Sequence, residues 1–325
     1  MDRTRVAVVG GGQNCEHEVS LASAASVAAA LDPAAYAVER LTIAEDGRWL
    51  HHDAEVGLAA AVRVLQSCAA VLPIVHGPRG EDGSLAALCE LAGVPYVGSG
   101  VRTGALAMDK WATKLVAEAV GVATAPGSLL TRGDAVEAQP WTGPVVVKPV
   151  AAGSSHGVTL VRAPHELRPA LEVAFSLDER VLVEDLLVGR EIDVAVLTLA
   201  DGSRLVAPPL EIVVEAGALF DTGRKYDGSA DFRLPADVDG VLLEELETAA
   251  TTMYDALGCA GLARIDFFVT AEGVVLNEVN TMPGLTEQSQ APKMFAAAGL
   301  PYSDLLDELV RGALARAAPV VPFTL

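Results

Sequence analysis

The sequence is short of positive charge and has no long apolar segment. Its 325 residues include 23 lysines and arginines against 43 aspartates and glutamates, which gives a formal net charge of −20 with histidine neutral. Binding to a nucleic-acid backbone or an anionic membrane needs clustered Lys and Arg, so we expect neither partner. No stretch approaches the roughly 18 apolar residues of a membrane span, and the first residues do not resemble a secretory signal. We therefore expect a cytoplasmic protein.

Cysteine is scarce as well, and two common nucleotide-binding fingerprints are missing. The four cysteines lie far apart without a CxxC pair, so we expect free thiols. Neither a Walker A sequence nor GxGxxG occurs, and any nucleotide must be held locally by a few lysines, glycine amides and a metal. The chain is rich in apolar residues, at 51% of the total with a mean hydropathy of +0.36. It can bury a sizeable core, and its length suggests two or three domains.

The predicted elements alternate in the manner of an α/β fold. In the first hundred residues, a strand at 5–9 leads through glycines into an Ala-rich helix at 19–31, followed by strands at 38–43 and 69–75 and a helix at 84–92. That order is typical of an open, largely parallel sheet. The remaining predicted elements are strands at 145–148, 159–161, 181–184, 193–199, 210–214, 263–269 and 274–279, and helices at 105–120, 166–176, 241–257 and after Pro292 and Ser303.

A predicted hairpin near the carboxyl end carries the most informative group of side chains. Residues 271–273 have the composition of a turn between two strands. If the turn is centred on its middle residue, Asp266 and Glu278 lie opposite each other, and Asn280 projects from the same face. Two carboxylates and an amide oxygen suit a hard cation such as Mg²⁺, although an exposed acidic hairpin has the same composition. Arg264 shares this face, as an ion-pair partner of Asp266 or as an electrophilic group.

The small residues at 151–157 have the composition of a phosphate-binding loop. They would let backbone amides approach a phosphate, with Ser154 and Ser155 as hydroxyl donors and Lys148 as a point charge. An ordinary hairpin loop is equally compatible with this composition.

The glycine turn at 10–20 is similar to a dinucleotide site but has Cys15 in place of the third glycine, which disfavours a dinucleotide-dependent oxidoreductase. Glu16 and Glu18 would repel a pyrophosphate and suit an ammonium group better, and they would equally stabilise the start of the following helix. His76 follows a predicted strand, where it is compatible with a ligand contact or with a structural hydrogen bond.

Taken in order, these segments resemble the D-alanine–D-alanine ligases of the ATP-grasp superfamily. Each segment alone is modest, but eight in register over nearly the whole chain are specific. They are GGGQNCEHEVS at 10–20, HGPRGEDGSLAALCELAGVPYVGSG at 76–100, MDK at 108–110, VVVKPVAAGSSHGV at 145–158, VLVEDLLVGREIDVAV at 181–196, FDTGRKY at 220–226, GLARIDFF at 261–268 and NEVNTMPGLTEQS at 277–289.

The resemblance implies a mixed α/β chain with the three-domain ATP-grasp fold, in which ATP binds between the central and C-terminal domains. It implies an N-terminal α/β domain at 1–100 for the first substrate, a central nucleotide-binding domain at 101–190, and a C-terminal domain at 191–325 for metal binding and catalysis. It also implies two Mg²⁺ ions, with Mn²⁺ as a substitute, and ATP and D-alanine as small-molecule substrates. We further expect a homodimer.

The resemblance also implies roles for individual residues. For ATP it implies Lys110, Lys148, Ser154, Ser155, Gly157, Glu184, Leu187, Glu191 and Lys225, and for the metal ions Asp266, Glu278 and Asn280. For the two D-alanines it implies Glu16 on the first ammonium with His76 nearby, Lys225 on the transferred phosphoryl group, Ser289 on the second carboxylate, and Gln290 beside that subsite. For catalysis it implies Arg264 and the Gly284 amide as oxyanion donors, and a hydrogen-bonded trio of Glu16, Ser154 and Tyr226.

The implied reaction is the ATP-dependent joining of two D-alanines, through a D-alanyl phosphate, for peptidoglycan synthesis. The acyl phosphate must be shielded from water, and we expect the polar, glycine-bearing segment at 215–233 to form the lid; a solvated surface loop is the alternative. A paralogue that joins D-alanine to D-serine, D-lactate or another amino acid, and a non-catalytic nucleotide-binding protein, are the competing functions. Tyr226 favours a dipeptide product, whereas Gln290 stands where an apolar residue is frequent and leaves the second substrate open.

Overall fold

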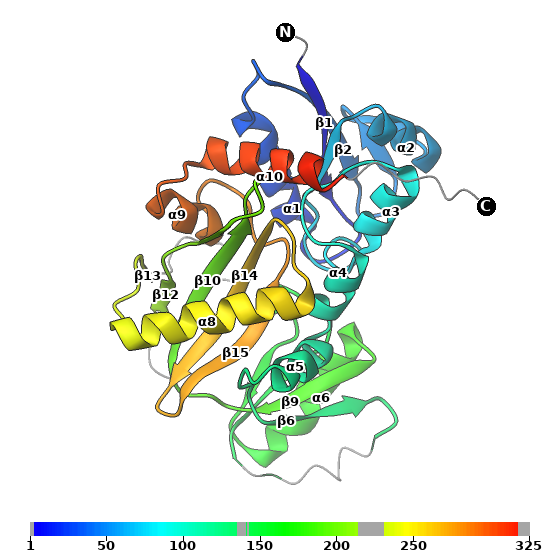
Figure 1. The fold of residues 1–325 in the computed structure, drawn as a ribbon. Coiled ribbons are helices and arrows are strands. Elements are labelled where there is room, and N and C mark those ends of the chain that lie inside the picture. The colour runs from blue at the N-terminus through cyan, green and yellow to red at the C-terminus, as the bar shows by residue number, and fades with distance from the viewer. Residues whose placement is uncertain (1–2, 135–140, 142, 214–230, 318–325) are drawn as a thin grey trace, which may run out of the picture.

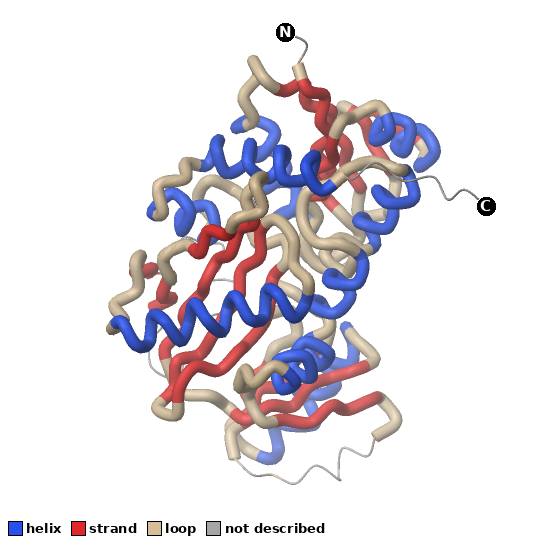
Figure 2. Tube along the Cα trace, in the orientation of Figure 1, coloured by secondary structure: helices blue, strands red, loops and turns tan. Residues whose placement is uncertain are grey.

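The computed structural model describes residues 3–134, 141, 143–213 and 231–317. Three β-sheets with their helices follow one another down the molecule (Figure 1), and the tube in Figure 2 separates the strands of each sheet from the helices that cover them. The mixed α/β class expected from the sequence is confirmed.

The first sheet has the strand order β4-β3-β2-β1-β5, in which β2, β1 and β5 run parallel, as predicted. β1 is buried from its third residue onward, as a central strand of a parallel sheet should be. Its strands are β1 (Thr4–Gly11), β2 (Tyr36–Ile43), β3 (Trp49–His51), β4 (Ala54–Val56) and β5 (Ala70–Pro73), and its helices are α1 (His17–Ala30), α2 (Leu58–Gln66) and α3 (Ser84–Ala92).

The second sheet is antiparallel with the order β6-β9-β7-β8. One face is covered by α6, which buries Leu171 and Ala174 against Val147 and Val181. The elements are β6 (Gly127–Thr131), β7 (Val145–Pro149), β8 (Thr159–Val161), α6 (Pro164–Leu177) and β9 (Arg180–Asp185).

The third sheet is also antiparallel, with the order β13-β12-β10-β14-β15 and β11 paired to β10. Helix α8 lies across one of its faces (Figure 1) and buries Leu246, Met253 and Tyr254 in a core with Ile265 and Phe267. The elements are β10 (Arg190–Thr198), β11 (Arg204–Val206), β12 (Leu210–Val213), β13 (Asp231–Arg233), α8 (Gly240–Leu257), β14 (Leu262–Thr270) and β15 (Gly273–Asn280).

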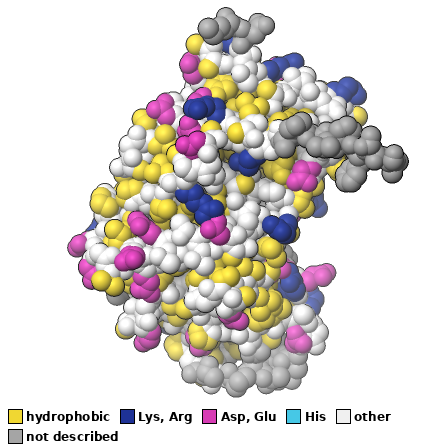
Figure 3. Space-filling model, in the orientation of Figure 1, with side chains coloured by type: hydrophobic (Ala, Val, Ile, Leu, Met, Phe, Trp, Pro, Cys, Tyr) yellow, Lys and Arg dark blue, Asp and Glu magenta, His cyan; other side chains and the backbone are white. Residues whose placement is uncertain are grey.

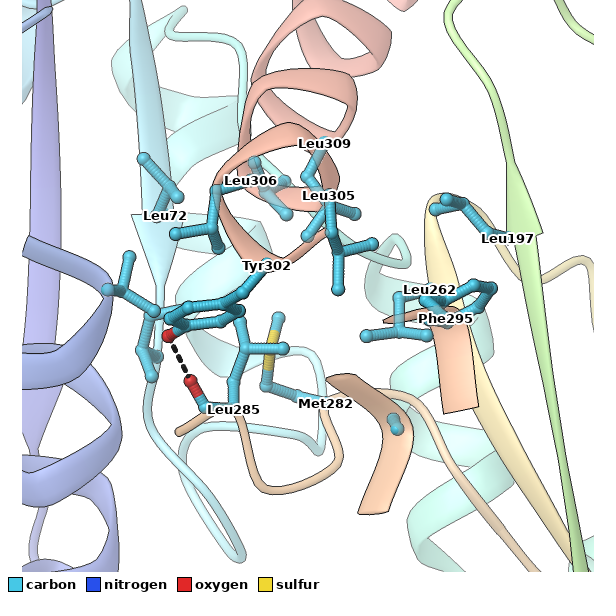
Figure 4. Close-up of a cluster of buried hydrophobic side chains, with 14 of the residues drawn as sticks. Leu72, Leu197, Leu262, Met282, Leu285, Phe295, Tyr302, Leu305, Leu306 and Leu309 are labelled. Atoms are coloured by element: carbon cyan, nitrogen blue, oxygen red, sulfur yellow. Dashed lines mark hydrogen bonds between the residues drawn. The ribbon is translucent and has the colours of Figure 1, made fainter. Parts of the chain in front are cut away.

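A continuous apolar core joins the first sheet to the third (Figure 4). Leu72 of β5 and Leu197 of β10 belong to it, and the carboxyl-terminal helix α10 (Tyr302–Arg316) fills the space between them with leucines. Each such side chain contributes about 1.5–3 kcal/mol by leaving water. The Tyr302 hydroxyl donates to the Leu285 carbonyl over 2.6 Å, which anchors the segment between β15 and helix α9 (Gln290–Ala297).

Some elements differ from the sequence prediction. The helix predicted at 105–120 is two helices, α4 (Val101–Met108) and α5 (Lys110–Ala119). Asp109 leaves the helical conformation between them, and its carboxylate caps α5 by accepting from the Ala112 amide over 2.9 Å. Of the predicted lid at 215–233, residues up to 230 lie outside those that the structure describes, and the last three form β13, which no periodicity predicted.

Neither a membrane-spanning helix nor a disulfide is found among the described residues. No helix in the described ranges is long and apolar enough to cross a membrane. All four cysteines are free thiols, as predicted. On the face shown in Figure 3, acidic and basic side chains are interspersed.

Candidate active site

A cavity of about 670 Å³ is lined by segments that begin or end in all three sheets. Most of the residues singled out in the sequence line it, although they are up to 274 positions apart in the chain. They are Glu16, His76, Lys110, Ser154, Glu191, Arg264, Asp266, Glu278, Asn280, Gly284, Ser289 and Gln290.

Other predicted site residues do not line this cavity. Lys148, Ser155, Gly157, Glu184 and Leu187 are absent from its wall. Lys225 and Tyr226 lie outside the described residues, so the expected trio is represented here by Glu16 and Ser154 alone.

The β14–β15 hairpin brings Asp266 and Glu278 face to face, as predicted, but by a different route. Its turn has two residues, because Thr270 pairs with Gly273, and a regular ladder from that turn would set Asp266 opposite Asn277. A β-bulge between Asp266 and Phe267 leaves Asn277 as an extra residue, which restores the Asp266–Glu278 pair. The bulge therefore places both carboxylates on one face.

The Arg264 guanidinium lies among acceptors on this face. It donates to both carboxylate oxygens of Asp266, each over 2.7 Å, and to Gln290 Oε1 over 2.8 Å, and its Nε lies 3.3 Å from Asp193 Oδ2. Burial lowers the pKa of Arg264, but the charges of Asp266 and Asp193 outweigh this and hold that pKa well above its usual range. The Asn280 amide donates to Asp266 Oδ2 over 2.9 Å.

Lysines link this face to the central sheet. Lys110 Nζ donates to the Ala152 carbonyl over 2.8 Å and lies 3.4 Å from Glu278 Oε2, so it joins the small-residue loop to the acidic hairpin. Lys148 Nζ lies 3.5 Å from Oδ1 of the bulged Asn277. Both lysines therefore lie between the central sheet and the hairpin.

Glu184 lies behind these lysines, buried between Lys148 and Lys114, whose Nζ is 2.6 Å from Glu184 Oε1. Burial raises the pKa of Glu184, but the two lysine charges outweigh it, and the net effect is a lowered pKa. Lys114 was not singled out in the sequence, because a lysine in an amphipathic helix normally faces solvent. The ion pair with Glu184 therefore holds Lys148 in position.

Glu16 is packed against two glycine loops. A Cβ at Gly77 would lie 2.4 Å from Glu16 Oε2, and one at Gly153 only 2.2 Å from it, so a side chain at either position would displace the Glu16 carboxylate. The Ser154 hydroxyl donates to Glu16 Oε1. The buried Oε2 has no hydrogen-bond partner within the described part of the chain. A buried carboxylate oxygen without a donor is costly, and an ammonium group would satisfy it.

His76 and Glu81 fix the loop after β15. The ring of His76 donates from Nδ1 to the Met282 carbonyl over 2.8 Å, since that oxygen can only accept, and Nε2 lies 2.9 Å from the Ser23 hydroxyl. Burial lowers the pKa of His76. Glu81 accepts from the Gly77 amide over 2.8 Å, and burial together with the charge of Glu16 raises its pKa to about 8.

Glu81 is a site residue that the sequence did not single out. It lies in the segment at 76–83, within a run of residues typical of turns, and no spacing distinguished it from a solvated loop carboxylate. Asp193, described above with Arg264, was missed because its partner Arg264 lies 71 residues away in the chain.

Ser289 and Gly284 lie close together at the start of α9. A Cβ at Gly284 would be 3.2 Å from Ser289 Oγ, which accepts from the Thr286 amide over 3.1 Å. Gln290 follows Ser289 and accepts a hydrogen bond from Arg264. The accepting atom is Oε1, since a guanidinium can only donate. The buried Nε2 of Gln290 has no hydrogen-bond partner in the described ranges.

The donor set fits hard cations. Carboxylates outnumber cationic side chains on the cavity wall, with Glu16, Glu18, Glu81, Glu191, Asp266 and Glu278 against Lys110, Arg264 and Lys293. Asp266, Glu278 and Asn280 offer oxygens on one face of the hairpin. Oxygen donors with excess negative charge are the environment that Mg²⁺ prefers.

Comparison with known proteins finds the same family by sequence and by structure. Family models described as the C-terminal and N-terminal parts of D-ala D-ala ligase match residues 116–311 and residues 5–64 and 54–99. D-alanine–D-alanine ligases from Mycolicibacterium smegmatis and Deinococcus radiodurans are 38% and 40% identical to the chain. The matches cover 97% and 96% of it, and 96% and 99% of those proteins.

Solved structures agree. The D-alanine–D-alanine ligase of Coxiella burnetii has a TM-score of 0.83 at 30% identity, with 98% of this chain and 95% of that one covered. A D-Ala:D-Ser ligase of Enterococcus faecalis has a TM-score of 0.84 at 33% identity, with 96% and 100% covered. The Bacillus anthracis D-alanine–D-alanine ligase, solved with ATP, has a TM-score of 0.81 at 27% identity, with 97% and 98% covered.

Proposed function

Because the chain belongs to the D-alanine–D-alanine ligase family, we propose that it joins two D-alanines in an ATP-dependent reaction for peptidoglycan synthesis. The observation that carries this proposal is Glu16 Oε2, a buried carboxylate oxygen without a donor among the described residues, at a cavity that also contains Arg264 and an acidic hairpin. This oxygen can accept a hydrogen bond from the ammonium group of an amino acid.

The first step activates the carboxylate of the first D-alanine. Its oxygen attacks the γ-phosphorus of ATP, ADP leaves, and a D-alanyl phosphate forms. Glu16 would hold the ammonium of this D-alanine, and His76 and Glu81 would keep the surrounding loops in place through Met282 and Gly77. Lys110 and Lys148 would offset the negative charge of the phosphates.

We propose that Asp266, Glu278 and Asn280 hold two Mg²⁺ ions, with Mn²⁺ as a substitute. When bound, these ions would neutralise the charge that accumulates on the phosphate oxygens. The three side chains share one hairpin face, and the bulge at Asn277 keeps them on it.

In the second step the amine of the second D-alanine attacks the acyl carbon, phosphate leaves, and a proton is lost. Arg264 and the Gly284 amide would donate to the oxygen that becomes negative in the tetrahedral intermediate. Ser289, close to Gly284, would hold the carboxylate of the second D-alanine. The domain limits at 100 and 190, the homodimer and a cytoplasmic location belong to the same proposal.

D-serine is the second candidate for the acceptor substrate. One solved relative is a D-Ala:D-Ser ligase, and Gln290 places an amide where an apolar side chain is frequent. Its Nε2 has no partner in the described ranges, so a substrate hydroxyl would supply an acceptor.

The test is an assay of phosphate release with ATP, Mg²⁺ and a panel of D-amino and D-hydroxy acids, with products identified by mass spectrometry. We expect D-alanyl-D-alanine from D-alanine alone. If D-alanine gives no phosphate, or if depsipeptide with D-lactate predominates, the proposed substrate is wrong. Release of ADP without any amide product would indicate a nucleotide-binding or hydrolytic protein instead.

A further inference from the structure

Asp193 is a buried carboxylate behind the acidic hairpin. It stands on β10 directly opposite Asp266 of β14, and it is 0% exposed. Its neighbours Ile192 and Val194 point into the core beneath α8. Asp193 therefore projects from the other face of the sheet, towards Arg264, whose Nε lies 3.3 Å from its Oδ2.

A buried charge is retained only at a cost. Removing a carboxylate from water is unfavourable by several kcal/mol unless a cation or hydrogen bonds compensate it. Arg264 supplies that charge, but the same guanidinium also donates to both oxygens of Asp266. Two carboxylates on adjacent strands therefore share one guanidinium.

Asp266 is engaged by donors in a way that conflicts with its proposed role. Its Oδ1 accepts from Arg264 Nε, and its Oδ2 accepts from Arg264 Nη2 and Asn280 Nδ2. A cation that binds Asp266 competes for these lone pairs and repels the guanidinium. Arg264 must then keep its place in the site through another anion.

We propose that Asp193 is a positioning residue that retains Arg264 in the site, through Nε, when Asp266 turns an oxygen to a divalent cation. Besides Asp266, whose Oδ1 lies 2.7 Å from Arg264 Nε, Asp193 already has an oxygen 3.3 Å from that nitrogen. It stands on a strand whose register with β14 is fixed by continuous pairing from Arg190 to Leu197. This inference rests on the proposed function only for the catalytic role of Arg264. The competition between its guanidinium and a cation for Asp266 does not depend on that function.

The experiment compares Asp193→Asn with the wild type and with Glu211→Gln. Glu211 is a matched control, because it is a buried carboxylate on the neighbouring strand β12 with an arginine partner, Arg190, at 2.8 Å, and it does not line the cavity. Three properties are measured. Electron paramagnetic resonance measures Mn²⁺ binding in the presence of ADP, and the other two readouts are steady-state kinetics and thermal unfolding.

For Asp193→Asn we expect weaker Mn²⁺ binding, since Arg264 then has one carboxylate partner fewer and competes more strongly with the cation for Asp266. We expect kcat to fall by about 10–100-fold, as for other residues that orient an active group. The KM for ATP should change little, and Asp193→Glu should recover part of kcat. Glu211→Gln should leave Mn²⁺ binding and kcat at wild-type values. Unchanged Mn²⁺ affinity and kcat in Asp193→Asn would overturn the proposal, and so would a drop in melting temperature with unchanged Mn²⁺ affinity.

A measurement on the unmodified protein covers the case in which the variant does not fold. With Arg side chains labelled with ¹⁵N, the Arg264 Nε–H should remain protected from solvent exchange when ADP and Mg²⁺ are added. Loss of that protection would mean that no anion holds Nε once the cation is bound, and the proposal fails. Neither this nor Mn²⁺ binding requires turnover, so a failure to ligate D-alanine would count against the proposed function alone.

Discussion

Two networks of charged side chains in this molecule have opposite balances. On the first sheet, the single carboxylate Glu39 accepts from Arg5 over 2.9 Å and lies 2.7 and 3.0 Å from the ring nitrogens of His51 and His52. On the third sheet, the single guanidinium of Arg264 is surrounded by the carboxylates Asp193 and Asp266. The first network has one carboxylate for three basic side chains, and the second has two carboxylates for one guanidinium.

The difference favours the hairpin, and not the first-sheet cluster, as the proposed cation site. Glu39, His51 and His52 have the spacing of metal ligands, but Arg5 already neutralises the carboxylate, so the group is satisfied as an ion-pair network. The hairpin carries Glu278 and Asp266, with Asp193 on the neighbouring strand, and in the described part of the chain these three carboxylates lie near Lys110 and Arg264. Carboxylates gathered in a buried site are costly for folding, and real proteins keep such groups at functional sites.

The strongest way to break the anionic network is Glu278→Gln. The amide keeps the size of the side chain but removes the charge opposite Asp266, so we expect turnover to fall by at least about 10³-fold, since both metal charge and phosphate positioning depend on it. Phosphate release measures the effect, and circular dichroism should report an intact fold. Glu272→Gln in the turn of the same hairpin is the control and should retain activity. Turnover of Glu278→Gln near the wild-type rate would contradict the metal assignment.

Arg264→Lys tests the cationic centre of the same network. Lysine keeps the charge but cannot make the bidentate contact with Asp266, and the oxyanion would lose a donor. We expect kcat to fall by about 10²–10³-fold, measured under saturating ATP and D-alanine. A preserved kcat with a raised KM for D-alanine would contradict the proposal that Arg264 donates to the oxyanion.

Gln290→Leu sharpens the comparison at the edge of the network. It removes the acceptor on Arg264 and the unpartnered Nε2 while it keeps the side-chain volume. We expect the ratio of kcat/KM for D-serine to that for D-alanine to fall by roughly 10-fold, because a hydroxyl loses its donor. Competition between the two acceptors, with products counted by mass spectrometry, measures the ratio. An unchanged ratio would mean that Gln290 does not contact the acceptor.

Glu39→Gln tests the donor-rich network, and its effect should be the smallest. Burial raises the pKa of Glu39, but hydrogen bonds from His51, His52 and Arg5 outweigh it and lower the pKa to about 2. Because its pKa is lower in the folded state, ionised Glu39 stabilises the fold at pH values above its unfolded pKa of about 4.3. This contribution is lost as the pH falls towards 2. We expect a loss of about 1 kcal/mol at neutral pH, with ligase activity unchanged. Urea unfolding at pH 7 and pH 3 should show the difference at pH 7 and a smaller one at pH 3.

The sequence predicted much of the fold and many of the residues that line the cavity, but not how they are brought together. Asp266 and Glu278 were expected to pair on the assumption of a turn centred on Glu272. The turn is one residue shorter, and the bulge at Asn277 compensates, which no residue pattern indicates. The break at Asp109 was missed because an Ala-rich sequence continues through it. Asp193 was missed because its partner Arg264 is 71 residues away.

The anchoring of α10 has a consequence for the order in which the chain folds during synthesis. Val6 and Leu72 of the first sheet share their core with Leu305 and Leu309 of α10. A ribosome makes the sheet first and the helix last, so for most of translation that face of the sheet lacks its final cover. The nascent N-terminal sheet therefore keeps this apolar surface exposed until α10 has been synthesised.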